Sequence, residues 1–146
     1  MTIIERIIQH ILNHPIHPLI VHFPIALSGA ALFFILLALW KKSKILEQVA
    51  FANIALAAVS TLVAEVIGMV DNRINYGGNA PNYQWKIVFA SLLLVVTALL
   101  SITRWRNPDL MYRKSTKIYY IAAYFVAFAI CGILGILGSI IMYGGF

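Results

Sequence analysis

The sequence contains few charged residues for its length. Only 11% of its 146 residues are Asp, Glu, Lys or Arg, and only five of these are acidic. Soluble domains carry about 25% charged and about 45–50% apolar residues, whereas 62% of this chain is hydrophobic and its mean hydropathy is +0.88. A soluble domain of this length cannot bury so much apolar surface, because small folds leave a large fraction exposed. The composition therefore excludes a soluble enzyme and a disordered chain, and it predicts an integral membrane protein.

The chain also has a single cysteine, Cys131, which lies inside a long apolar run. One cysteine cannot form a disulfide or a multi-cysteine metal site within one chain, so a secreted disulfide-stabilised scaffold is excluded. We interpret Cys131 as a small packing residue.

Acidic residues are outnumbered by 11 Lys and Arg residues, which gives a formal net charge of +6. A basic chain can bind nucleic acid, but most of these residues cluster directly after long apolar runs, in residues 41–44 and 104–117. This is the pattern of the positive-inside rule. We therefore expect a lipid bilayer rather than nucleic acid around the chain. Both basic loops are expected in the cytoplasm, and both termini and residues 71–84 outside.

Four long apolar runs follow one another within residues 14–146. At about 1.5 Å per residue, each is long enough to cross the ~30 Å hydrocarbon core of a bilayer. The sequence therefore predicts an all-α fold, an integral membrane four-helix up-down bundle. The predicted spans are residues 19–40, 46–70, 85–103 and 118–143.

The first 13 residues have the apolar period of a helix, but they are too few to cross a bilayer, which takes about 20 residues. They also lack the positive start and the small-residue cleavage site of a secretory signal. We expect residues 1–13 to form a short amphipathic helix on the membrane surface. A proline follows both His14 and His17 and predicts extended or turn backbone there, whereas Pro24 fits the first turn of the first spanning helix.

Small residues recur every four positions along the last span. In lipid, small residues let helix backbones approach closely, so we expect this helix to pack against a similar stripe on the second span. The stripe in the last span consists of Ala123, Ala127, Cys131, Gly135 and Ser139, widened by Gly132 and Gly138, and the facing stripe consists of Ser60, Ala64 and Gly68.

All four histidines precede residue 23, and the expected topology places them at the outer surface. Three further ionisable residues, Glu65, Asp71 and Lys86, fall near the same surface. Ionisable groups within a span usually face the bundle interior and pair with one another. We therefore predict a structural polar cluster of Glu65, Asp71 and Lys86 near His22, and we expect only loop charges at the cytoplasmic end.

The segment His14-Pro-Ile-His-Pro-Leu-Ile-Val-His-Phe-Pro24 resembles the signature of a bacterial family of four-helix integral membrane proteins that is catalogued as a domain of unknown function. The hallmark of that family is His-Pro-x-x-Val-His-Phe-Pro at the start of helix one, which this chain matches from His17 to Pro24. Weaker likeness lies in Gly68-Met-Val-Asp71 and in the glycine-rich last helix.

This resemblance implies a multi-pass protein of the bacterial cytoplasmic (inner) membrane. Some relatives are fused or adjacent to redox domains, which implies a place beside electron-transfer proteins. Many members carry another His at the outer start of helix three, whereas this chain reads Tyr83-Gln-Trp-Lys-Ile87. If relatives bind haem or metal through that position, this chain has lost the site.

The histidines leave two cofactor hypotheses open beside a purely structural role. A b-type haem takes axial imidazole ligands and would use His22 with His14 or His17, or His22 of a second copy, or Met69 or Lys86 as an unusual partner. Imidazole also suits zinc, copper and nickel. The histidines available for such a metal are His10, His14, His17 and His22, with Glu65 or Asp71 as an oxygen ligand.

The sequence shows no Ser–His–Asp arrangement and no Gly-rich phosphate loop, so we predict no catalytic residues. We expect a small accessory or scaffold subunit of a bacterial membrane complex. The resemblance favours a respiratory or redox complex. Its partners would be other membrane subunits or a second copy of itself. The alternative function is electron transfer through a b-type haem or a metal bound by the outer histidines.

Overall fold

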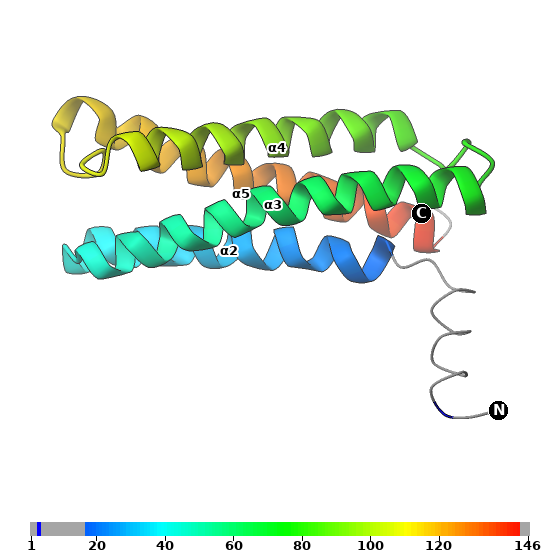
Figure 1. Ribbon diagram of the computed structural model, residues 1–146, viewed down its shortest axis with the longest axis horizontal. Helices are drawn as coiled ribbons and strands as arrows, with labels where there is room; N and C mark the ends of the chain where they lie inside the picture. The colour runs from blue at the N-terminus through cyan, green and yellow to red at the C-terminus, as the bar shows by residue number, and fades with distance from the viewer. Residues whose placement is uncertain (1–2, 4–16, 144–146) are drawn as a thin grey trace.

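A computed structural model describes Ile3 and residues 17–143. Four long helices run side by side in it (Figure 1). They are α2 (His17–Lys41), α3 (Lys44–Asn75), α4 (Tyr83–Arg106) and α5 (Lys114–Tyr143). All four are long and apolar enough to cross a membrane, by length and composition. The predicted all-α membrane bundle is thereby confirmed, while the predicted surface helix of residues 1–13 lies outside the described residues apart from Ile3.

The helices form a closed ring in which the backbone of each packs beside two others. Contacts join α2 to α3, α3 to α4, α4 to α5, and α5 back to α2. The connections between successive helices are short, so neighbours in sequence lie antiparallel and side by side (Figure 1). The turn between α2 and α3 and the loop between α4 and α5 lie at one end, which we call the Glu47 end. The loop between α3 and α4 lies at the other end, which we call the Asp71 end.

This ring corrects the predicted pairing of the two small-residue stripes. The helices α3 and α5 lie diagonally opposite, and their backbones do not pack against each other, because the short connections place α5 between α4 and α2. The buried part of the α5 stripe, Ala127 and Cys131, faces the bundle core, and the Cys131 thiol donates to the Pro24 carbonyl of α2 at 3.9 Å. Gly29 of α2 similarly leaves room for the ring of Phe128 on α5.

The first spanning helix also begins earlier than the prolines predict. Helix α2 starts at His17, so the expected extended or turn backbone at His17 is wrong. Pro24 lies inside the helix and is buried, rather than in its first turn. It has no N–H to give to the carbonyl of Ile20, and the remaining helix tolerates this loss because both neighbouring turns are continuous. His14 lies outside the described residues.

Side-chain hydrogen bonds help to fix the two ends of α3. Ser43 precedes the helix and accepts a hydrogen bond from the Leu46 amide at 3.4 Å, as an N-cap does. At the far end, the buried Asn72 side chain accepts from the Ala80 amide at 2.9 Å, which holds the loop to α4 against the helix. Gly77 and Gly78 make that turn with φ of +57° and +87°, a region that favours glycine.

Apolar side chains fill the centre of the ring and also cover its outside. The core includes Ile35, Ile54 and Leu93, each at most 1% exposed. On the outside, large apolar side chains such as Phe33 and Leu99 are more than half exposed. A chain in water would not tolerate so many exposed apolar groups, so this surface fits lipid.

Replacing Ala127 with Leu tests the core packing on α5. Ala127 is fully buried, so the added volume should destabilise the bundle by about 1–3 kcal/mol through overpacking. The measurement is unfolding of the detergent-purified protein by heat or denaturant. Ala122 lies on the exposed side of the same helix, so Ala122→Leu should leave stability nearly unchanged. Equal effects of the two variants would contradict the described packing of α5.

Candidate functional site

The predicted polar residues at the Asp71 end join neighbouring parts of α3 and α4. The Ser91 hydroxyl of α4 donates to the Glu65 carboxylate of α3 at 2.5 Å. Asp71 accepts a hydrogen bond from Asn75, one helical turn later. Lys86 is half-buried on α4, near enough to Asp71 for their charges to interact. The contacts of Glu65 and Lys86 thus join α3 to α4, whereas the Asp71–Asn75 bond lies within α3.

The predicted metal ligands are only partly placed by the structure. His22 lies on α2 with its side chain exposed, and Phe23 beside it is also exposed. Backbone is described for His17, but its side chain, like His10 and His14, lies outside what the structure describes. Among the residues that are described, no group of three His, Cys, Asp or Glu side chains could hold a metal ion. A histidine site for haem or metal thus stays a prediction.

A buried ion pair at the Glu47 end is the strongest polar feature of the bundle. Glu47 of α3 is 1% exposed and Arg104 of α4 is 8% exposed. The Arg104 Nε donates to Glu47 Oε1 at 2.5 Å, and its Nη2 donates to Oε2 at 2.7 Å. This two-pronged geometry is the strongest way for a guanidinium to bind a carboxylate. The Arg104 guanidinium also lies 5.1 Å from the ring centre of Phe51, a cation–π contact.

Two tyrosines of α5 extend this pair into the core. The Tyr120 hydroxyl donates to Glu47 Oε1 at 2.7 Å. Its oxygen lies 3.0 Å from the Tyr124 hydroxyl, and because the Tyr120 proton goes to Glu47, Tyr124 is the donor of that bond. The two rings meet edge to face, with centres 5.3 Å apart. We call these four residues, Glu47, Arg104, Tyr120 and Tyr124, the buried polar cluster, and it joins three of the four helices.

The cluster overturns the expectation that this end carries only loop charges. Helix α3 begins at Lys44 and α4 ends at Arg106, so Glu47 and Arg104 belong to terminal helical turns rather than to loops. A signal for this was present in the sequence. Glu47 stands at helical spacing with a buried face of α3, and Arg104 with a buried face of α4. Those faces are Ala50, Ile54, Ala57, Thr61 and Ala64 on α3, and Leu93, Thr97 and Leu100 on α4.

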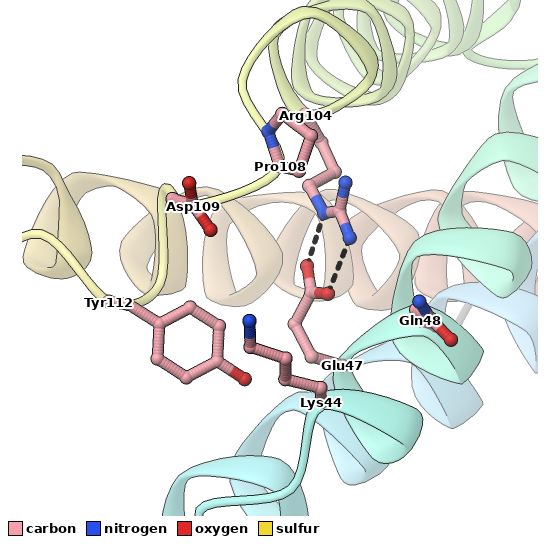
Figure 2. A pocket seen from close by; sticks show the side chains of 7 residues that line it. All are labelled: Lys44, Glu47, Gln48, Arg104, Pro108, Asp109 and Tyr112. Atoms are coloured by element: carbon pink, nitrogen blue, oxygen red, sulfur yellow. Dashed lines mark hydrogen bonds and ion pairs between the residues drawn. The ribbon is translucent and has the colours of Figure 1, made fainter.

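A cavity of about 120 Å³ opens beside the cluster, between the helix ends and the loop from α4 to α5 (Figure 2). Its back wall is the Glu47–Arg104 pair. The nearer walls are Lys44 and Gln48 of α3 with Asp109 and Tyr112 of the loop. The Lys44 ammonium lies 5.3 Å from the centre of the Tyr112 ring. Burial raises the pKa of the Tyr112 phenol above its ordinary value, with the Glu47 carboxylate adding to the effect, so this hydroxyl remains a hydrogen-bond donor at neutral pH.

Removing one partner of the ion pair should be far more harmful than removing both. We expect Glu47→Leu to destabilise the bundle by about 3–5 kcal/mol, because it leaves the Arg104 charge buried without a counter-charge. The double variant Glu47→Leu with Arg104→Leu should recover much of that loss. Thermal unfolding in detergent measures both. Gln48→Leu, at the neighbouring exposed position, is the control, and a Glu47→Leu variant as stable as this control would contradict the role given to the pair.

Comparisons with known proteins point to a family rather than to a described relative. Neither the curated proteins nor the solved structures gave a match to this chain. A family model described as "Predicted membrane protein (DUF2231)" matches residues 13–144, nearly the whole chain, including all four helices. With this match and the four apolar helices, the chain belongs to the DUF2231 family of membrane proteins.

Proposed function

We propose that the protein is a small accessory or scaffold subunit of a bacterial membrane complex, without catalysis of its own. The described chain consists almost entirely of the four helices and their short connections. Any partner of this bundle within the bilayer must therefore meet its lipid-facing side. The redox domains fused or adjacent to relatives in the resembled family favour a respiratory or redox complex.

One observation carries this proposal, the open glycine face of α5. Gly132 and Gly135 are exposed. Apart from the adjacent backbone of α5 itself, a Cβ placed on Gly132, Gly135 or Gly138 would meet no atom of the described residues within 4 Å. These glycines therefore do not serve packing within the described bundle. In lipid, exposed small residues allow a second helix to approach closely and gain dispersion contacts, so we assign this face to a transmembrane helix of another subunit.

The use of the interior polar groups supports the same proposal. The Glu47 carboxylate is bonded on both oxygens to Arg104 and Tyr120, and Glu65 accepts from Ser91. The hydroxyls of Thr61 and Thr97 donate to carbonyls of their own helices. The two carboxylates thus hold helices together, as a scaffold requires, whereas the two threonine hydroxyls are satisfied within their own helices.

The distribution of basic residues supports an inner-membrane orientation with the Glu47 end in the cytoplasm. By the positive-inside rule, the more basic end of a bundle faces the cytoplasm. Seven exposed basic residues surround this end, namely Lys41, Lys42, Lys44, Arg106, Arg113, Lys114 and Lys117. In this orientation the Asp71 end and the start of α2 face outward.

Gly135→Leu tests the partner face. A leucine there should block close approach of a second helix, so a membrane subunit that co-purifies in stoichiometric amount with the tagged wild-type protein should be reduced several-fold. The measurement is quantitative mass spectrometry of the complex purified from the native membrane. Because Gly135 meets no described neighbour, the stability of the isolated bundle should stay within about 0.5 kcal/mol.

Ala122→Leu is the control, since Ala122 is exposed on another side of α5, and it should retain the partner. If both variants retain the partner, the glycine face is not the contact. If only a second copy of this chain co-purifies, the accessory-subunit proposal is wrong and the face belongs to a homo-oligomer.

An absorption spectrum tests the alternative function. An accessory subunit without a cofactor should be colourless after purification, with no Soret band in oxidised or dithionite-reduced samples and no stoichiometric metal by elemental analysis. A Soret band with a sharp reduced α band, or bound metal, that is lost in His22→Ala would instead establish electron transfer through the histidines. If His22→Ala only lowers the melting temperature, the histidine is structural.

A further inference from the structure

The cavity at the Glu47 end contains polar groups that the bundle itself does not use. Arg104 lines this cavity and is only 8% exposed. Its Nε and Nη2 bond to Glu47, whereas its Nη1 has no acceptor among the described residues. Lys44 also lines the cavity. Within residues 17–143 the one ion pair is that of Arg104 with Glu47. The Lys44 ammonium therefore has no carboxylate partner among these residues. The unused donors thus belong to two cations of the cavity lining, one from α3 and one from α4.

The lining also contains an unused acceptor. Asp109 sits in the loop between α4 and α5, and its backbone carbonyl accepts from the amides of Tyr112 and Arg113. No described residue donates a hydrogen bond to its carboxylate. Figure 2 shows this carboxylate across the cavity from Lys44 and Gln48. The two cationic and two anionic side chains of the lining balance, so a ligand carrying one charge of each sign fits better than a net anion.

The cavity lies at the depth where lipid headgroups are found. Trp40, Trp105 and Tyr119 are at least 76% exposed and lie close to the helix ends at the Glu47 end. Exposed Trp and Tyr side chains mark the membrane–water interface. Large apolar side chains such as Ile45 and Ile102 are exposed on the same two helices that line the cavity, and they offer a surface for acyl chains.

We propose that this cavity binds the headgroup of a phospholipid that carries a primary ammonium beside its phosphate, as an ethanolamine phospholipid does. The phosphate accepts hydrogen bonds from the Lys44 ammonium, the Gln48 amide and the free Arg104 nitrogen. The primary ammonium donates to the Asp109 carboxylate. A quaternary ammonium has no N–H for Asp109, and the Tyr112 ring that could bind it by cation–π contact is already occupied by Lys44.

The site is independent of the proposed partner face, which lies on α5. The Glu47–Arg104 ion pair stays intact when a headgroup binds, because both oxygens of Glu47 remain bonded to Arg104 and Tyr120. The pair therefore holds the cavity wall in place. A bound headgroup would add a second contact between α3 and the loop from α4 to α5, beside the one between Lys44 and Tyr112.

Lipid retention tests this site. The full-length protein is purified in mild detergent and exposed to equimolar ethanolamine, choline and glycerol phospholipids with identical acyl chains, and bound lipid is counted by native mass spectrometry. We expect the ethanolamine lipid to be retained about tenfold more than the other two, the effect of one charge-assisted hydrogen bond. Asp109→Asn should abolish this preference, and Lys44→Gln should lower retention of all three lipids.

Lys42→Gln is the matched control, because Lys42 is an exposed lysine of the same end that does not line the cavity. It should retain the wild-type preference, and all variants should melt at the same temperature without added lipid. Equal retention of the three lipids, or an Asp109→Asn variant that behaves like Lys42→Gln, would overturn the proposal. Preferential retention of the glycerol lipid would overturn it too.

A competition experiment distinguishes a lipid from a soluble ligand. Soluble phosphoethanolamine should compete only weakly, and full competition at equal concentration would assign the site to a free metabolite instead of a lipid.

Discussion

The bundle depends on satisfying one buried carboxylate. Glu47 is almost fully removed from solvent, and an ionised carboxylate without partners would be very costly there. Its hydrogen bonds come from Arg104 of α4 and Tyr120 of α5. Since the fork of a guanidinium must lie in register with both oxygens, this contact fixes how far α3 and α4 slide along each other. Apolar packing in lipid is far less directional, so the polar contact selects one register among many.

The helix that lacks such a contact is held differently. No side chain of α2 joins the buried polar cluster, and its bonds to α5 include a weak one from the Cys131 thiol to the Pro24 carbonyl. Small residues instead bring it close, as where Gly29 faces Phe128. The ring is therefore tied by charge and hydroxyl groups at the Glu47 end of three helices, and by close packing along the fourth. The same ion pair that closes the bundle also forms the rigid back wall of the cavity.

The number of helices and their order around the bundle were predictable, because composition and connection length decide them. Apolar runs long enough for a bilayer give four helices, and short connections between them give the ring. The partners of individual residues were not predictable, because Glu47 and Arg104 are separated by 57 positions and both lie beside lysine-rich or arginine-rich loops. Their helical spacing with Ala50, Ile54 and Leu100 indicated burial, but spacing cannot tell which helix lies opposite. The stripe pairing failed for the same reason, since α3 and α5 each show small residues yet lie on a diagonal.

The length of α3 has a mechanical consequence. It comprises 32 residues, about 48 Å at ~1.5 Å per residue, whereas the hydrocarbon core measures ~30 Å. Helix α4 has only 24 residues. The Glu47–Arg104 pair fixes α3 and α4 relative to each other at the Glu47 end, so the excess length of α3 lies at the Asp71 end. Either the whole bundle tilts in the membrane, or Asp71 and Asn72 lie outside the hydrocarbon core. Bilayer thickness would then set the tilt of the molecule and the height of its α3–α4 loop above the membrane surface.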